Sequence, residues 1–245
     1  MIATGGKAVY GADVGILMLE ARFPRIPGDM GNARTWPFPV RYKVVRGASP
    51  DLVVRKGAPG LLGDFINAGR ELVEEGCRLI TTNCGFLALY QAELAEALEV
   101  PVATSALMQA APIQAALPSG RRVGILTIDV ESLTDRHLAL AGVPEGTPVA
   151  GVARGCEFQR VILDNEEALD VAQAERDMVE AALAFQAATP DLGAILFECT
   201  NMPPYKRAVA AATRLPVFSI ETYLTWFVAS MPHTDVVGAG SLSAG

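Results

Sequence analysis

The sequence holds little of what metal, nucleic-acid or cofactor sites usually require. Among 245 residues there are only two histidines and four cysteines, and none of them falls in a CxxC, HxxxH or HExxH spacing. This pattern argues against a zinc or iron–sulfur site. Charged residues make up 19% of the chain, the net charge is −7, and no run of Lys and Arg occurs. We therefore expect no metal and no nucleic-acid partner.

Signals for export or for a membrane are also missing. The first 23 residues contain one Lys, are interrupted by Asp13 and lack a small-residue cleavage site, so we interpret them as mature sequence. Residues 100–120 carry no charge, but three prolines and two glutamines divide them into a short strand and a helix. No membrane association is expected from such a segment. Four scattered cysteines fit free thiols in a reducing cytoplasm, which is the predicted location.

What the sequence does contain is a regular alternation of apolar strands and amphipathic helices. With 51% hydrophobic residues, a chain of this length can form its own core as one large domain or two small ones. A helix with an apolar face from Leu61 to Val73 is expected to end at Gly76, and a longer one is expected at 166–188. The alternation predicts an α/β protein with mostly parallel sheet. Eight apolar runs are predicted strands: 14–19, 41–45, 78–83, 100–105, 122–128, 149–153, 193–199 and 215–220.

Two segments interrupt the alternation. Residues 21–39 contain four prolines, two glycines and three arginines without an apolar period. A connection of this length is usually a functional loop or lid, and the alternative is a surface excursion without a role. The last ten residues, VVGAGSLSAG, are interpreted as a frayed tail, and their GAG opens no helix, so no dinucleotide site is predicted there.

The two halves of the chain look like copies of one α/β unit. The segment VGILML at 14–19 recurs as VGILTI at 123–128, an offset of 109 residues. Three further matches have an offset of 115: Val100-Pro101-Val102 with Leu215-Pro216-Val217, Ile80 with Ile195, and Cys84 with Cys199. Each of these two cysteines is therefore expected to close a strand and open the next helix.

That position is where open α/β sheets bind ligands, because helix N-termini there present free N–H groups. A helix N-terminus also stabilises a thiolate. If the copies face each other, one thiol stands on each side of a bound molecule. The neighbouring polar residues Asn83, Gly85, Thr200 and Asn201 would suit an anion such as a carboxylate.

The remaining cysteines and the histidines are given structural interpretations. A lone cysteine at a strand end is most often a small core residue, but two at matching repeat positions favour a function. Cys77 and Cys156 have no counterparts and are expected in the core. His137 and His233 are expected at the surface rather than as a catalytic base.

The motifs around the paired cysteines, TTNCGF at 81–86 and ECTNMP at 198–203, resemble those of the aspartate/glutamate racemase superfamily. This superfamily includes aspartate, glutamate and hydantoin racemases, maleate isomerases and arylmalonate decarboxylases. The resemblance implies two pseudo-symmetric Rossmann/flavodoxin-like lobes with mostly parallel sheets and the active site between them. Lobe 1 would comprise residues 1–108 plus 222–245, and lobe 2 residues 109–221. The C-terminal helix, roughly 222–231, would cross back to the first lobe.

The resemblance also implies an activity, that of a cofactor-independent amino-acid racemase of the aspartate/glutamate type. Cys84 and Cys199 would act as acid and base on opposite faces of the substrate Cα, which requires no pyridoxal. The substrate would be a small carboxylate, and a homodimer is the family's habit. The candidate substrate-binding residues are Asn83, Gly85, Thr200, Asn201, Thr127, Glu20 and Arg22.

Two other interpretations stay open. Glutamate and aspartate racemases usually carry Asn and Thr after the first cysteine, whereas here Asn83 precedes it and Gly85 follows. A hydantoin racemase, or a decarboxylase or isomerase similar to arylmalonate decarboxylase or maleate isomerase, is therefore an alternative. A non-catalytic solute-binding module would also have two lobes and a cleft, but paired strand-end thiols serve no obvious purpose in simple binding.

Overall fold

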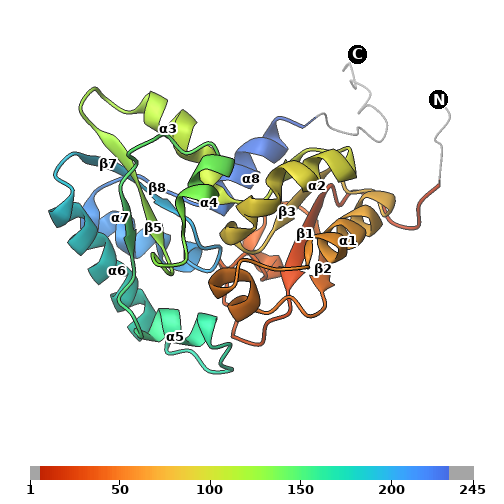
Figure 1. Ribbon diagram of the computed structural model, residues 1–245, viewed down its shortest axis with the longest axis horizontal. Helices are drawn as coiled ribbons and strands as arrows, with labels where there is room; N and C mark the ends of the chain where they lie inside the picture. The colour runs from red at the N-terminus through yellow and green to blue at the C-terminus, as the bar shows by residue number, and fades with distance from the viewer. Residues whose placement is uncertain (1–5, 232–245) are drawn as a thin grey trace, which may run out of the picture.

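The computed structural model describes residues 6–231, and it consists of two lobes that each contain a four-stranded parallel sheet (Figure 1). The first sheet has the order β2-β1-β3-β4 and the second the order β6-β5-β7-β8. All pairings are parallel, so the predicted α/β fold is confirmed. The strands are β1 (Val14–Leu19), β2 (Val40–Val45), β3 (Leu79–Thr82), β4 (Val102–Ala103), β5 (Arg122–Thr127), β6 (Val149–Gly151), β7 (Leu192–Phe197) and β8 (Val217–Phe218).

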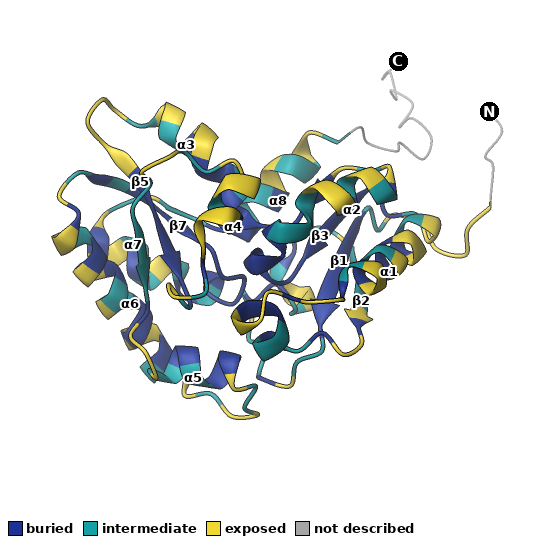
Figure 2. Cartoon of the chain, in the orientation of Figure 1, coloured by how far each residue is buried: buried dark blue, intermediate teal, exposed yellow. Residues whose placement is uncertain are grey.

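The helices lie against these sheets and their inward faces are buried (Figure 2). The predicted first helix is confirmed, and the predicted helix at 166–188 begins only at Val171. It starts there because the Asp170 side chain accepts the Gln173 N–H at 2.9 Å and so caps it. The α-helices are α1 (Leu62–Glu74), α2 (Gln91–Leu98), α3 (Ala110–Ala116), α4 (Asp135–Leu140), α5 (Glu157–Leu163), α6 (Val171–Ala188), α7 (Lys206–Thr213) and α8 (Ile220–Ala229).

Glycines at repeat-equivalent positions of the central strands let the core close. A Cβ at Gly15 in β1 would lie 2.7 Å from the Ile80 side chain, and one at Gly124 in β5 would lie 2.5 Å from the Phe185 ring. Both distances are too short for a real side chain, so these strands need glycine for their neighbours to pack. The repeat in the sequence thus corresponds to a repeat in the packing of the two sheets.

The 21–39 segment crosses from the first lobe to the second. The Met30 backbone N–H donates to the Thr200 carbonyl, and Asn201 Nδ2 donates to Asp29 Oδ2 at 2.5 Å. Gly28, at φ +101°, lies against the backbone of Pro204. We call residues 21–39 the strap, because they tie the end of β1 to the loop that follows β7.

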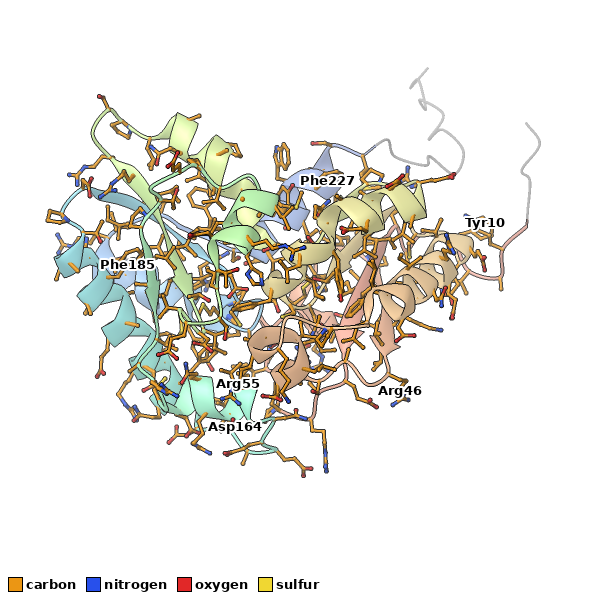
Figure 3. The ribbon with its side chains drawn as sticks, in the orientation of Figure 1. Tyr10, Arg46, Arg55, Asp164, Phe185 and Phe227 are labelled. Carbon is orange, nitrogen blue, oxygen red and sulfur yellow. The ribbon has the colours of Figure 1, made fainter. Side chains whose placement is uncertain are left out.

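An exposed contact also joins the lobes. An ion pair between Arg55 Nη1 and Asp164 Oδ1 at 2.9 Å links a short π-helix of lobe 1, Asp51–Arg55, with the end of α5 (Figure 3). Within the predicted lobe 2, Gln109 Nε2 donates to the Ser219 carbonyl at 2.9 Å, just before α8. That helix begins at Ile220, two residues earlier than expected. The lobe boundaries at 108/109 and 221/222 stay predictions.

Two expectations from the sequence concern a membrane span and the C-terminal residues. No helix within residues 6–231 is long and apolar enough to span a lipid bilayer. The C-terminal tail and His233 lie outside the described residues.

Candidate active site

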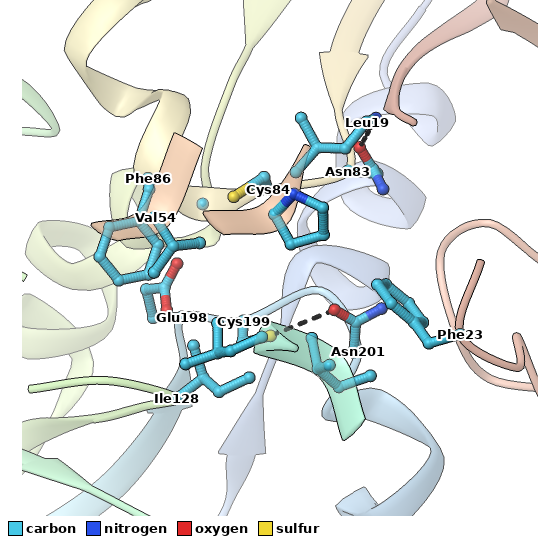
Figure 4. Close-up of a pocket in the computed structure, with 14 residues that line it drawn as sticks. Leu19, Phe23, Val54, Asn83, Cys84, Phe86, Ile128, Glu198, Cys199 and Asn201 are labelled. Carbon is cyan, nitrogen blue, oxygen red and sulfur yellow. Dashed lines mark hydrogen bonds between the residues drawn. The ribbon is translucent and has the colours of Figure 1, made fainter. Parts of the chain in front are cut away.

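A narrow pocket opens where the carboxyl ends of the two sheets face each other. Its cavity volume is about 20 Å³, and its walls come from both lobes (Figure 4). We call this region between the carboxyl ends of the two sheets the seam. The residues that follow the strands lie there, and α/β proteins bind ligands at this end of their strands. Among the residues that line the pocket are Asn83, Cys84 and Phe86 of lobe 1 and Glu198, Cys199 and Asn201 of lobe 2.

Cys84 follows β3 and directly precedes a 3-10 segment, Gly85–Tyr90, that leads into α2. The residue is only 8% exposed, and burial together with the charge of Glu198 raises the pKa of its thiol. The backbone N–H groups of Phe86 and Leu87 and the charge of Arg25 act in the opposite direction. The thiol therefore rests protonated, with donors in place that favour its thiolate once a ligand changes the local charge.

Cys199 follows β7 and precedes a turn and a 3-10 segment, Pro203–Tyr205, rather than an α-helix as expected. Its thiol donates to Asn201 Oδ1 at 3.4 Å. Burial and the charge of Glu198 raise the pKa of this thiol well above 9, and Asp29 and Cys84 add to the effect. The Asn201 backbone N–H acts in the opposite direction, while the Asn201 amide oxygen accepts the proton of the neutral thiol.

Glu198 is a functional candidate that the sequence pattern did not single out. It is fully buried at the end of β7, its Oε2 accepts the Thr127 hydroxyl at 2.8 Å, and the backbone N–H of Ile128 also donates to the carboxyl group. Its Oε1 has no hydrogen-bond partner among the described residues. Burial raises the pKa of this carboxyl to about 7. A charged residue that ends an otherwise apolar strand, AILFEC, is the signal that could have revealed it.

Gly85 allows this carboxyl to reach the seam. A Cβ at Gly85 would overlap Glu198 Oε1 and lie 2.6 Å from the Glu198 carbonyl oxygen. Any other residue at the start of the 3-10 segment would push Glu198 and the second lobe away, so glycine is required at position 85.

The structure brings most of the predicted site residues together. Asn83, Gly85 and Asn201 line the pocket with the two cysteines. The Thr200 hydroxyl instead donates to the Asn83 carbonyl at 2.5 Å and so bridges the lobes. Thr127 lies behind the pocket and orients Glu198.

Glu20 and Arg22 are not part of this group. Glu20 accepts hydrogen bonds from Arg46 and from the Gly47 backbone, and Arg22 pairs with Glu167 on the surface. Each finds a partner outside the pocket, because the chain turns away from the seam after β1. The strap residue Phe23 lines the pocket instead.

The prediction that His137 lies at the surface is wrong. It is buried in α4, where its ring and the Thr134 side chain form a reciprocal cap, and it packs edge-on against Phe86 with ring centroids 5.3 Å apart. Burial lowers the pKa of this imidazole, so it is neutral near pH 7. Cys77 is in the core as expected, whereas Cys156 is only partly buried, before α5.

Comparison with known proteins identifies relatives over nearly the whole chain. No protein-family model matches the sequence. A dimethylsulfoniopropionate lyase of Durusdinium sp. clade D is 30% identical over 226 residues, which cover 89% of this chain and 74% of that protein. Dimethylsulfoniopropionate lyases 3 and 7 of Emiliania huxleyi are 33% and 31% identical over 241 residues, or 93% of this chain. The chain spans 62% of the length of lyase 3 and 70% of lyase 7.

Solved structures share the fold at lower identity. Arylmalonate decarboxylase superposes with a TM-score of 0.59 at 18% identity, covering 88% of this chain and 91% of that chain. Glutamate racemase from Bacillus anthracis gives 0.57 at 16%, covering 89% and 82%, and an aspartate racemase homologue from Pyrococcus horikoshii gives 0.53 at 15%, covering 89% and 99%. The predicted aspartate/glutamate racemase superfamily fold is confirmed.

The predicted activity is wrong. An amino-acid racemase, and with it the class of isomerases, was expected from the paired cysteines, but the sequence relatives are named lyases and not racemases. The motifs around the two cysteines identified the superfamily correctly and did not distinguish the reaction within it.

Proposed function

We propose that this chain, which belongs to the family of the dimethylsulfoniopropionate lyases, is itself a lyase that cleaves a small sulfonium carboxylate of this kind. The observation that carries the proposal is the pair of cysteine thiols that the two lobes of a member of this family bring to one pocket. Dimethylsulfoniopropionate carries a carboxylate at one end and a dimethylsulfonium cation at the other. The expected small carboxylate substrate thus takes a specific form.

The reaction we propose is a β-elimination. A base removes a proton from the carbon next to the carboxylate, the C–H electron pair becomes the C=C bond, and the C–S electron pair leaves with sulfur. The products are dimethyl sulfide, acrylate and a proton, so atoms and charges balance. The leaving sulfide is neutral and needs no acid. One base is therefore sufficient, whereas inversion of a Cα centre requires two.

Cys84 is our candidate for that base. Two backbone N–H groups, of Phe86 and Leu87, and the charge of Arg25 favour its thiolate. Cys199 has one such N–H, that of Asn201, and Asp29 and the Asn201 amide oxygen oppose its ionisation. A bound sulfonium supplies further help, because a unit positive charge about 4 Å from a thiolate is worth about 4 kcal/mol at an effective dielectric constant of 20, or about 3 pKa units. Cys199 then serves as a neutral thiol that contacts the substrate on its other face.

The carboxylate of the substrate must also be held while its neighbouring carbon loses a proton. Negative charge moves onto the carboxylate in that step, and hydrogen-bond donors that are already in place stabilise it. Asn83 and Asn201 supply amide N–H groups at the pocket, and Asn201 is itself fixed by Asp29.

The test is to incubate the purified protein with dimethylsulfoniopropionate and to measure dimethyl sulfide in the headspace by gas chromatography and acrylate by NMR. We expect equal amounts of both products from the wild-type chain, and a rate about 10²–10⁴-fold lower from Cys84→Ala. If the folded wild-type protein releases no dimethyl sulfide at millimolar substrate, the proposed function is wrong.

Two further expectations stay predictions. A cytoplasmic location rests on the free state of all four cysteines, which suits a reducing compartment. A homodimer rests on the habit of the superfamily and is measured directly by analytical ultracentrifugation.

A further inference from the structure

The two lobes place chemically different groups at equivalent positions of the pocket. Asn83 and Glu198 each directly precede a site cysteine and are separated by the repeat offset of 115 residues. The side-chain oxygen of each accepts the backbone N–H at the end of its central strand, that of Leu19 for Asn83 at 2.6 Å and that of Ile128 for Glu198. The internal symmetry therefore holds in the backbone and is broken in the side chains.

The break in symmetry gives the pocket two unlike ends. Once its oxygen is bound, Asn83 still presents an amide NH₂ that has no partner among the described residues, and this group is a donor. Glu198 presents Oε1, which is an acceptor without a partner in the same part of the chain. Figure 4 shows Glu198 with Phe86, Val54 and Ile128 on one side of the two thiols, and Asn83 on the other. One end is thus acidic and apolar, and the other is an amide donor.

The acidic end is suited to a cation that cannot donate hydrogen bonds. A buried carboxylate oxygen without a donor is costly, and a positive charge in the pocket compensates that cost. A sulfonium has positive charge and apolar methyl groups but no N–H or O–H. A sulfonium is therefore best held by a carboxylate oxygen that accepts no other hydrogen bond and by an apolar surface. Phe86 supplies that surface, and the face of its ring also attracts a cation.

We infer that Glu198 and Phe86 form a subsite for the dimethylsulfonium cation, and that Asn83 at the opposite end receives the carboxylate. This inference rests on the proposed function and assigns the orientation of its substrate. In this orientation the carbon that loses a proton lies near the amide end, the C–S bond points to Glu198, and both thiols lie between.

Two unreactive analogues of the substrate, which match each other in shape, test the subsite. In β-alanine betaine a trimethylammonium cation, which has no N–H, replaces the sulfonium, and in 4,4-dimethylpentanoate a neutral tert-butyl group does. Calorimetric titration at pH 8, where Glu198 is ionised, is expected to show at least tenfold tighter binding of the cationic molecule to the wild-type protein. Glu198→Gln is expected to reduce that preference to less than threefold. Glu167→Gln, which removes an exposed carboxylate, is expected to leave it unchanged.

A pH series on the wild-type protein keeps the test independent of how Glu198→Gln folds. The preference for the cationic molecule is expected to fall as the pH drops from 8 to 6, through the pKa of about 7 of Glu198. The other groups that face this region are the two thiols, His137 and Asp129. The thiols have pKa values raised above 9, so they stay neutral throughout, and the pKa of His137 is lowered from 6.5 by burial, so the imidazole gains its proton only below the pKa of Glu198.

The outcomes separate the inference from the function. If the wild-type protein binds both molecules equally, or if Glu198→Gln retains the tenfold preference, the sulfonium subsite is wrong even when dimethyl sulfide is released. If the preference is present and depends on Glu198 but no dimethyl sulfide forms, the subsite stands for an onium carboxylate and the proposed lyase reaction is wrong.

Discussion

The strongest stability prediction concerns the carboxylate of Asp29, which anchors the strap to the second lobe. Asp29 accepts from Arg25 Nη1 at 2.9 Å, from the Gly31 backbone at 2.7 Å and from Asn201 Nδ2 at 2.5 Å. The side chains of Arg25 and Asp29 are only 13% and 3% exposed. In Asp29→Asn, the amide NH₂ must face one of these donors, and the Arg25 charge loses its counter-ion in a buried place.

Breaking a buried pair by removing one partner costs about 3–5 kcal/mol, because the other charge is left uncompensated. For a chain of this size, such a loss lowers the melting temperature by roughly 6–20 °C. We expect urea unfolding of Asp29→Asn, followed by circular dichroism, to show this decrease in the free energy of unfolding. The exposed pair Arg154–Glu131 is the control, and Glu131→Gln is expected to cost less than about 1 kcal/mol.

A second variant separates the charge from the shape of the strap. Arg25→Met with Asp29→Leu removes both charges and leaves apolar volume, so it is expected to recover most of the stability that Asp29→Asn loses. It is also expected to be a poor catalyst of the proposed reaction, because Asn201 has lost its hydrogen bond to Asp29. If Asp29→Asn unfolds within about 1 kcal/mol of the wild-type protein, or if the double variant is no more stable than the single one, the reasoning about this buried pair is refuted.

Three further predictions follow from the pocket. Cys84→Ala is expected to lower the rate of dimethyl sulfide release by about 10²–10⁴-fold, and Cys199→Ser by less, because only one base is required; equal losses in the two variants would contradict this assignment. Gly85→Ala is expected to destabilise the fold by about 1–3 kcal/mol in thermal unfolding, since its Cβ would overlap Glu198. Gly63→Ala in α1, where a Cβ meets nothing within 4 Å, is the control and should be neutral or stabilising. The pKa of Glu198 is raised from 4.5 to about 7 in the folded state, so its stabilising contribution is fully present below pH 4.5 and is lost as the pH rises through 7. The loss amounts to about 3 kcal/mol. When the free energy of unfolding is measured against pH, Glu198→Gln is expected to remove this decrease. If the decrease is the same in the variant, Glu198 does not titrate in this range.

The fold could be predicted well from the sequence because it is built from two copies of one pattern. The matching positions of Cys84 and Cys199 in the repeat predicted both thiols at one seam, and the pocket contains both. Glu20 and Arg22 were misplaced because a charge on a chain does not reveal its partner, and Arg46 and Glu167 lie far along the sequence. His137 was misplaced because its burial depends on Phe86, which arrives from the other lobe.

The reaction was harder to predict than the site, for a chemical reason. Racemisation and β-elimination both begin with removal of a proton next to a carboxylate, so the residues around the thiols can be alike in both. What differs is the far end of the substrate. The residue that faces that end in our proposal, Glu198, differs from its repeat equivalent Asn83. The repeat is visible in the sequence because the two cysteines are identical. The residues that precede them, Asn83 and Glu198, differ, so the repeat did not reveal them as a pair.

The seam between the lobes also has a consequence for how this protein can be divided. Each lobe contributes one thiol, and the stretch of chain between the two thiols passes through the turn that joins α3 to β5. A break at Gly120, an exposed residue of that turn, would leave Cys84 on one fragment and Cys199 on the other. Neither fragment would hold a complete site, and activity would return only when the two associate. For the proposed reaction, release of dimethyl sulfide would thus report directly whether the two halves of the chain are docked.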